Sequence, residues 1–428
     1  MKVFHLLVPL ALAAWPLTAQ DAAPAKSSAP SKAAVSALIA SIETDLTAIT
    51  GLQFHKDVPY AVIGKAQLRA FLEARMKDAI KPEEIHAEET TLKMFGFLPP
   101  DFDLKKTTVD LLTEQAAAFY DYHKKKLFIL ETGDSTTDLH TEAEKMALAH
   151  ELGHALADQH FRLEKYIREG AHSDDGSSAR LAVMEGQASW LMTAYLSKAA
   201  TGQAEVPPGV LELMSHAVES SASQYPVFSK APLYLRESLV FPYTSGMLFQ
   251  NAVFEKLGKE SFAEVFRRPP QSTQQIIHPE KYLDHVAPDI PALPGIPGAK
   301  QFRKVGDGTL GEFDFRVLLQ QYAGKEEAGS LAPHASGGMY ELLEAKRDRH
   351  PVLAFAANWD TPDSARAFFG DYRKVLSGKS KSCGFDRESD KELSGHNEYG
   401  HFRVRLDGKR FESVEGLPSP PGSAGEVH

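Results

Sequence analysis

Residues 139–166, LHTEAEKMALAHELGHALADQHFRLEKY, are rich in Ala, Leu and Glu and predict one long amphipathic helix. The helix places His150 and His154, four residues apart, on one face, where both imidazoles can reach the same Zn²⁺ ion. Glu151 lies beside His150 and can accept a proton from a water molecule at that ion. The segment HELGH therefore predicts a zinc site with Glu151 as its general base.

A catalytic zinc needs a third protein ligand and an open position for water. Glu185 lies on the next predicted helix, residues 177–198, among the small and apolar residues of LAVMEGQA (181–188). A buried carboxylate is costly unless it is paired or bound to a metal, which favours Glu185 as the third ligand. Gly186 and Ala188 would let two helices approach closely enough for coordination.

His160 is the competing third ligand. Together with His150 and His154 it has the histidine spacing of HExxHxxGxxH. The glycine of that pattern is replaced by Ala157, whose Cβ disfavours the left-handed turn that would bring a third histidine back to the metal. We therefore expect Glu185 as the ligand.

The overall composition limits the possible classes of function. The chain has 428 residues, enough for one large or two medium hydrophobic cores. Asp and Glu outnumber Lys and Arg by 57 to 47, which argues against a nucleic-acid-binding surface, because binding phosphates requires a basic face. Cys383 is the only cysteine, so an intramolecular disulfide is excluded.

The N-terminus has the pattern of an export signal. A basic start is followed by an apolar run from Val3 to Leu17 and then by small residues, with cleavage expected near Ala19. Residues 20–32 are mostly Ala, Ser, Pro and Lys and are expected to form a disordered tether. We expect a secreted or periplasmic protein with no stable membrane insertion after signal cleavage.

The rest of the chain predicts a mainly helical α+β fold in two parts. Amphipathic helices are expected at 33–49 and 65–79, and a β-hairpin from Phe119 to Leu130 precedes the zinc helix. Prolines recur between Ala287 and Gly298 and indicate a boundary between a domain at 33–290 and an α+β region at 300–428, with a rigid loop across one domain as the alternative. Further elements are predicted as helices at 211–220, 246–257, 310–322 and 363–375, strands at 339–343 and 352–357, and a hairpin turning at Asp407-Gly408.

Several segments together resemble a group of bacterial gluzincin-like metallopeptidases. These are HELGHA (150–155), DQHF (158–161), MEG (184–186), GFLPPD (96–101), FYD (119–121), FPY (241–243), and ST (272–273) with HPEKY (278–282). The resemblance covers roughly residues 60–290 and implies a zincin-like domain that hydrolyses peptide bonds. It implies His150, His154 and Glu185 as zinc ligands, Glu151 as catalytic base, and the hairpin as the edge strand along which a peptide or protein substrate lies.

Two further parts of such a site are less clearly marked. Thermolysin-like enzymes carry an aspartate four residues after the ligand glutamate, and here that position is Ser189; Asp158 is either its replacement or a capping residue. For stabilising the oxyanion we favour His278, with Tyr243 and Tyr234 as alternatives. The rival interpretation of the whole chain is a non-catalytic exported protein that binds zinc structurally or binds a partner on the same scaffold.

Overall fold

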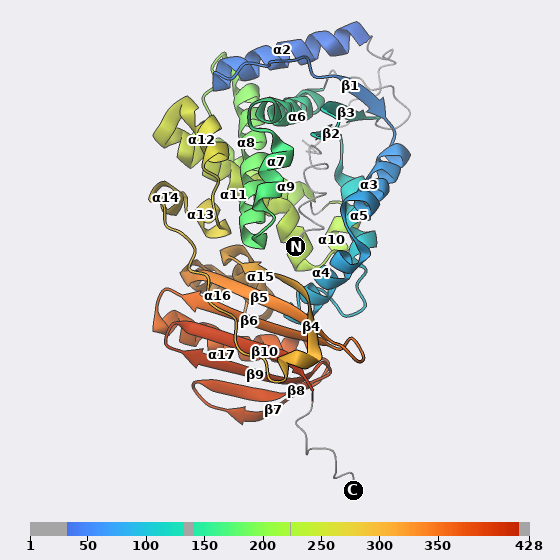
Figure 1. Ribbon diagram of the computed structural model, residues 1–428. Coiled ribbons are helices and arrows are strands. Elements are labelled where there is room, and N and C mark those ends of the chain that lie inside the picture. The colour runs from blue at the N-terminus through green and yellow to red at the C-terminus, as the bar shows by residue number, and fades with distance from the viewer. Residues whose placement is uncertain (1–31, 132–140, 223, 419–428) are drawn as a thin grey trace.

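The computed structural model describes residues 32–131, 141–222 and 224–418. The predicted signal peptide and almost all of the predicted tether lie outside these residues. The fold is mixed α+β, 58% helical and 19% strand, in agreement with the predicted class. Figure 1 shows a helical part at the top and a large sheet with its helices below.

The helical part contains most of the helices. In chain order they are α2 (Lys32–Thr50), α3 (Lys65–Ala79), α4 (Pro82–Phe95), α5 (Leu104–Gln115), α6 (Glu142–Phe161), α7 (Leu163–Gly170), α8 (Asp174–Thr201), α9 (Pro208–Ala222), α10 (Pro226–Lys230), α11 (Leu233–Leu257), α12 (Ser261–Arg267), α13 (Thr273–Ile277) and α14 (Pro279–Leu283). A 3₁₀ turn, Gly258–Glu260, joins α11 to α12. The helix predicted at 246–257 is the second half of α11, which begins at Leu233 and continues through Pro242.

A small three-stranded sheet lies beside α6. Its strands are β1 (Tyr60–Ile63), β2 (Ala118–Asp121) and β3 (Lys126–Leu130), in the order β1-β3-β2. The predicted hairpin is confirmed, because β2 pairs antiparallel with β3 through a turn in which Lys125 has a φ of 53°. Since β1 pairs with β3 on the other side, β2 is an edge strand of this sheet.

The single long helix predicted for 139–166 is wrong. Arg162 adopts a left-handed conformation with a φ of 56° and separates α6 from α7. One oxygen of Asp158 accepts the backbone N–H of Leu163 at 2.9 Å and so provides a partner for the start of α7. Local composition predicted continuation, but a side-chain hydrogen bond ends the helix here.

The large sheet has seven antiparallel strands in the order β4-β5-β6-β10-β9-β8-β7. They are β4 (Phe302–Leu310), β5 (Ala335–Ala345), β6 (Pro351–Trp359), β7 (Cys383–Glu388), β8 (Glu392–Asn397), β9 (Gly400–Asp407) and β10 (Arg410–Leu417). Helices α15 (Glu312–Tyr322), α16 (Lys325–Leu331) and α17 (Pro362–Gly378) accompany it, with short 3₁₀ turns at Ala299–Gln301 and Ala332–His334. The hairpin predicted at Asp407-Gly408 is confirmed between β9 and β10.

The two parts share one hydrophobic core. Phe95 at the end of α4 contacts the rings of Tyr340 on β5 and Phe355 on β6, at centroid distances of 5.6 and 5.2 Å. The proline-rich segment between the parts forms no helix or strand, and Asp289 in it donates its N–H to Ser336 at 2.9 Å. This hydrogen bond ties the segment to β5 of the lower sheet, and the domain boundary predicted here stays a prediction.

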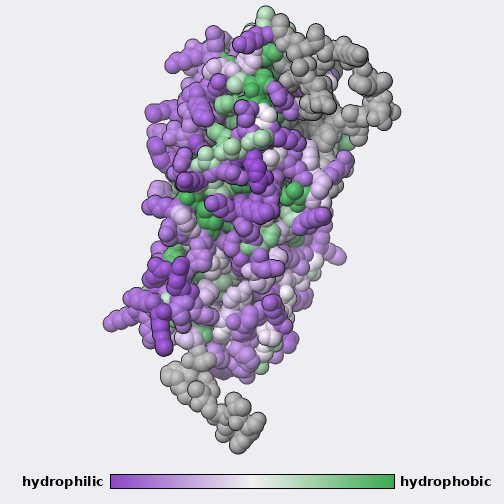
Figure 2. All heavy atoms as spheres, turned by 90° about the vertical axis from the view of Figure 1, so that its right-hand side faces the viewer, coloured by the Kyte–Doolittle hydropathy of each residue, from purple (hydrophilic) through white to green (hydrophobic). Residues whose placement is uncertain are grey.

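One described helix, α2, is long and apolar enough to cross a membrane by length and composition, with a mean hydropathy of 1.3. A buried core helix or a signal sequence passes the same test. The apolar face of α2, which includes Ile42 and Leu46, is buried, and the helix contacts α6 and α8 across the top of Figure 1. The face of the molecule shown in Figure 2 is mainly hydrophilic, with apolar residues in scattered groups.

Candidate metal centre

Three side chains from two helices meet in the helical part. The Nε2 atoms of His150 and His154 on α6 lie 3.1 Å apart. The Oε2 atom of Glu185 on α8 lies 3.2 Å from Nε2 of His150 and 3.3 Å from Nε2 of His154. All three residues are buried, and they form the one group of possible metal ligands found among the described residues.

This triangle of atoms has the dimensions of a zinc site. Ligand atoms about 2.0–2.1 Å from Zn²⁺ in a tetrahedron are separated from one another by about 3.3 Å. Hydrogen bonding alone accounts for the triangle poorly: if both Nε2 atoms donate to the carboxylate, no acceptor remains between the two imidazoles. A shared cation explains all three short distances at once.

The second carboxylate oxygen of Glu185 supports the same interpretation. Oε1 is buried and, among the described residues, no group has the geometry of a hydrogen-bond donor to it, although the Tyr243 hydroxyl lies near this carboxylate. A buried carboxylate oxygen without a partner costs several kcal/mol. A bound cation would neutralise the carboxylate and compensate that cost. The donor set of two imidazoles and one carboxylate is that of known catalytic zinc sites, so these residues fit Zn²⁺.

Small residues bring the helices together at this point. A Cβ on Gly153 of α6 would lie 3.4 Å from the Cα of Ala188, so the glycine of HELGH faces α8 directly. Gly186 faces another helix: a Cβ there would lie 2.1 Å from the carbonyl carbon of Gly246 on α11. The sequence predicted that Gly186 and Ala188 would let two helices approach closely. In the structure Ala188 contacts α6, and Gly186 contacts α11.

Glu151 is held by the edge strand. The backbone N–H of Tyr120 on β2 donates to Oε2 of Glu151 at 2.6 Å. Burial raises the pKa of Glu151 to about 8. The sequence contains no signal for this contact, because the donor is a backbone group that only the fold brings into place.

Asp158 ties α6 to the hairpin and does not orient a zinc histidine. Its carboxylate accepts the Tyr120 hydroxyl at 2.9 Å and the Lys125 ammonium at 2.7 and 2.8 Å. Ser189, at the position of the thermolysin-like aspartate, is buried, and its Oγ has no hydrogen-bond partner. Asp158 therefore fixes the strand that contacts Glu151, and it does not replace the missing aspartate.

Tyr243 on α11 is the oxyanion candidate that the structure brings to the triad. Its ring stacks on that of His150 at a centroid distance of 5.8 Å and an interplanar angle of 21°. Burial and the carboxylate of Glu185, toward which the hydroxyl is directed as a donor, raise the pKa of the hydroxyl well above the usual value. The hydroxyl is therefore neutral and can donate a hydrogen bond.

The structure places the other sequence candidates elsewhere. The Nε2 atom of His278, between α13 and α14, lies 3.0 Å from Glu312. The segment that carries His278 lies far from Glu185 along α8. Thr273, at the start of α13, contacts Asp175, which is ten residues and thus about 15 Å along α8 from Glu185. Two further candidates are also engaged away from the triad, as the Tyr234 hydroxyl donates to Asp314 and His160 Nε2 lies 2.8 Å from the carbonyl of Gln53.

The two histidines of the triad differ in the direction of their pKa shifts. Burial lowers the pKa of His150, which favours the neutral imidazole that a metal requires. For His154, burial is outweighed by the carboxylates of Glu185, Glu151 and Asp158, which raise its pKa. Burial opposes ionisation of Glu185, but the histidines outweigh it and lower the pKa of this carboxyl to about 2. Glu185 is therefore ionised at neutral pH.

The chain matches no protein-family model, no curated protein and no solved structure.

Proposed function

We propose that this chain is an exported zinc-dependent metallopeptidase. The observation that carries the proposal is the triangle formed by the Nε2 atoms of His150 and His154 and Oε2 of Glu185, with sides of 3.1 to 3.3 Å. The proposed fold of the helical part is zincin-like, with β2 as the edge strand beside α6. The predicted signal at residues 1–19 supports secretion or periplasmic localisation.

His150, His154 and Glu185 would hold the zinc ion and leave a position for water and substrate. Zn²⁺ in such a site is a Lewis acid that lowers the pKa of water and polarises a carbonyl group. The ligands come from two helices packed at Gly153 and Ala188, so the helix contact determines their spacing.

Glu151 would carry the proton during hydrolysis. The Tyr120 N–H engages Oε2, which leaves Oε1 to accept a proton from the attacking water. Glu151 then donates that proton to the leaving amine, and the peptide bond is broken. Burial raises the pKa of Glu151 to about 8, and the positive charge of a zinc ion held beside it would favour the ionised carboxylate that a base requires.

Tyr243 would stabilise the oxyanion that develops on the substrate carbonyl. Its stacking on His150 places it beside the metal ligands, and its hydroxyl stays neutral. The same role for His278 has weaker support, because His278 is paired with Glu312 away from the triad, whereas Tyr243 stacks on His150.

The edge strand β2 supports a peptide as the substrate. It pairs with β3 on one side only and contacts Glu151 through Tyr120. Main-chain hydrogen bonds to this strand edge would bring the carbonyl groups of an extended peptide alongside the base. All four residues of β2 are buried and the Tyr120 N–H is bonded to Glu151, so a peptide would use the main-chain groups of β2 that this contact leaves.

The rival function is a non-catalytic exported zinc-binding or partner-binding protein. A structural zinc site is usually closed by four protein ligands. Among the described residues the ligand group has three members, and the neighbouring Glu151 is anchored by a strand. Three ligands beside an oriented carboxylate favour catalysis.

A chelation experiment tests the proposal. The purified mature protein is analysed for metal and incubated with a peptide library before and after treatment with a chelator. We expect about one zinc per chain, cleavage by the metal-loaded protein, loss of cleavage after chelation, and recovery on adding Zn²⁺. Zinc binding without cleavage of any peptide would favour the structural rival.

A further inference from the structure

A basic cleft opens beside the proposed catalytic site. It has a volume of about 610 Å³ and lies between the loop after α2, the β2–β3 turn, the end of α6 and α7. Two of its lining residues, Tyr120 and Asp158, also border the catalytic site. Tyr120 binds Glu151 through its N–H, and Asp158 follows His154 by one turn of α6, about 6 Å. The cleft is thus adjacent to the site through Tyr120 and Asp158, although none of the three proposed ligands lines it.

The walls of the cleft carry more positive than negative charge. Five cationic side chains line it, Lys56, Lys125, Arg162, Lys165 and Arg168, against three carboxylates. This local excess runs against the net charge of the chain, which is −10. The cleft therefore carries more positive charge than the composition of the whole chain would predict.

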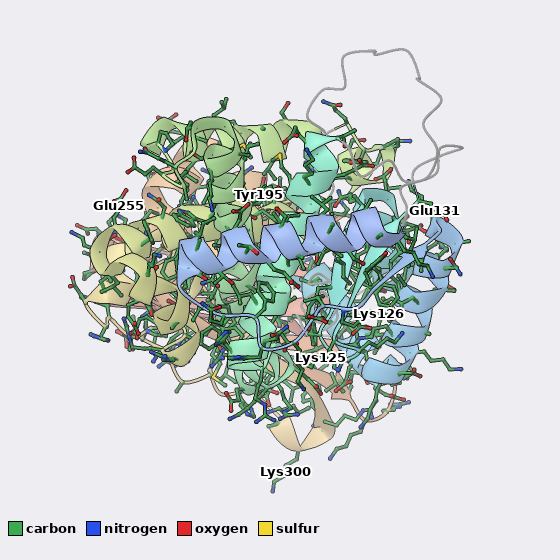
Figure 3. All side chains as sticks on the ribbon, turned by 90° about the horizontal axis from the view of Figure 1, so that it is seen from above. Lys125, Lys126, Glu131, Tyr195, Glu255 and Lys300 are labelled. Carbon is green, nitrogen blue, oxygen red and sulfur yellow. The ribbon has the colours of Figure 1, made fainter. Side chains whose placement is uncertain are left out.

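Three of these cations are available to a ligand. Lys125, visible at the hairpin turn in Figure 3, is already bound to Asp158, and Lys165 lies 3.5 Å from Glu169. Within the described part of the chain, the charged groups of Lys56, Arg162 and Arg168 form no ion pair. An acidic ligand would supply the missing partners.

The backbone at Arg162 supports a binding role. This residue has a Cβ but adopts a φ of 56°, a conformation that costs roughly 1 kcal/mol. The break between α6 and α7 occurs at this residue, and its side chain lines the cleft. Strained residues of this kind are concentrated at ligand-binding sites.

Building on the proposed peptidase function, we propose that this cleft binds acidic side chains of the substrate. An extended peptide advances about 3.3 Å per residue, so a cleft that begins about 6 Å beyond His154 would receive side chains roughly two to four residues from the cleaved bond. Arginine and lysine pair well with carboxylates. The substrate class is therefore an extended peptide with Asp or Glu at those positions, on one side of the cleaved bond.

Matched peptides test this inference. Two fluorogenic peptides carry Glu or Gln at the second to fourth positions on each side of one cleavable bond, and kcat/KM is measured with the zinc-loaded mature protein. Each exposed ion pair should contribute up to about fivefold. We expect the Glu peptide to be cleaved more efficiently at low ionic strength, mainly through a lower KM, with the difference shrinking at high salt.

Charge removal in the cleft identifies the residues responsible. The variant R162Q/R168Q should lose the preference for the Glu peptide, whereas K300Q/R387Q, which removes two cations from the lower part of the molecule, should keep it. Lys300 is labelled at the lower edge of Figure 3, away from the hairpin lysines. A preference that survives in R162Q/R168Q would overturn the inference.

A binding measurement separates this inference from the proposed activity. The affinities of both labelled peptides for the E151Q variant are compared by fluorescence anisotropy, so no cleavage is required. Tighter binding of the Glu peptide would support the cleft even if no peptide is cleaved. Cleavage of both peptides at equal rates with equal affinities would overturn the cleft while leaving the peptidase function intact.

Discussion

The backbone N–H of Tyr120 donates a 2.6 Å hydrogen bond to Glu151, and the hydroxyl of the same tyrosine donates to Asp158 at 2.9 Å. Tyr120 of β2 therefore contacts α6 at two residues, Glu151 and Asp158, which are seven positions apart in the sequence. The carboxylate that we propose as the base is thus oriented by the strand along which, in this proposal, the substrate lies. Strand and helix must keep their relative position for the base to function.

The tyrosine hydroxyl can be removed without disturbing the backbone contact. In Tyr120→Phe, Asp158 keeps Lys125 and the Leu163 N–H as partners. We expect the free energy of unfolding to fall by about 1 kcal/mol, as for loss of one hydrogen bond, with zinc content unchanged. Urea unfolding and metal analysis check this; loss of zinc from the variant would show that the Tyr120–Asp158 bond supports the metal site itself.

Glu185 and Ser189 lie one turn apart on α8, so alanine substitutions at these two residues form a matched pair of variants. Glu185→Ala removes one of three ligands and should weaken zinc affinity by at least about 100-fold. Ser189→Ala removes a buried hydroxyl that has no partner, so it should keep zinc and stabilise the fold by about 1 kcal/mol. Competition with a zinc indicator and urea unfolding measure the two effects, and equal zinc affinity in both variants would remove Glu185 from the ligand set.

The crossing of α8 and α11 depends on Gly186. In Gly186→Ala the new Cβ would meet the carbonyl carbon of Gly246 at 2.1 Å, so we expect destabilisation by at least about 3 kcal/mol. Gly209 on α9 has open space around it, and Gly209→Ala should be neutral or stabilising by up to about 1 kcal/mol. Chemical denaturation of both variants tests the contrast; a Gly186→Ala protein as stable as the parent would show that the helices can separate freely.

Asp175 predicts how stability depends on pH. Burial raises the pKa of Asp175 from 3.8 to about 6 in the folded state, so folding favours the protonated carboxyl. The free energy of unfolding is therefore highest below pH 3.8, where Asp175 is protonated, and falls as the pH rises through 6. A shift of this size lowers the free energy of unfolding by about 3 kcal/mol between pH 4 and pH 8. Asp314, whose pKa burial raises to about 7, adds a loss in the same direction over pH 4 to 8.

Substitution isolates the contribution of Asp175. One oxygen, Oδ1, accepts both the N–H and the hydroxyl of Thr273, so Asp175→Asn can keep both hydrogen bonds while removing the charge. We expect the variant to be more stable than the parent at pH 8, with a flatter pH profile. Asp307→Asn on β4, at an exposed position, is the control and should leave the profile unchanged. Parallel profiles for Asp175→Asn and the parent would refute the assignment.

The sequence predicted the zinc helix, the hairpin and the C-terminal hairpin because each depends on local signals. Periodicity marks α6, a polar turn joins β2 to β3, and Gly408 supplies a positive φ at the last turn. The end of α6 was not predictable in this way, because it depends on the Asp158 side chain and not on a helix-breaking residue. Strand β7 was missed because its residues are largely exposed and lack an apolar alternation.

The candidate site was predictable only as far as its ligands. His150, His154 and Glu185 follow from spacing and from a carboxylate in an apolar setting, and the structure brings these three together. The choice between Tyr243 and His278 depended on which helix crosses α8 beside Glu185, which is a long-range property. Gly186 and Gly246 bring α11 to that place, and Tyr243 arrives with it.

The central claim, a zinc-bound triad served by Glu151, is tested most directly by comparing the parent protein with Glu151→Gln. Glutamine retains an oxygen that can accept the Tyr120 N–H, so the strand contact can survive. We predict about one zinc per chain in both proteins and peptide cleavage slower by at least about 100-fold in the variant. A variant that cleaves at the parent rate, or a parent protein that binds no zinc, would contradict the account.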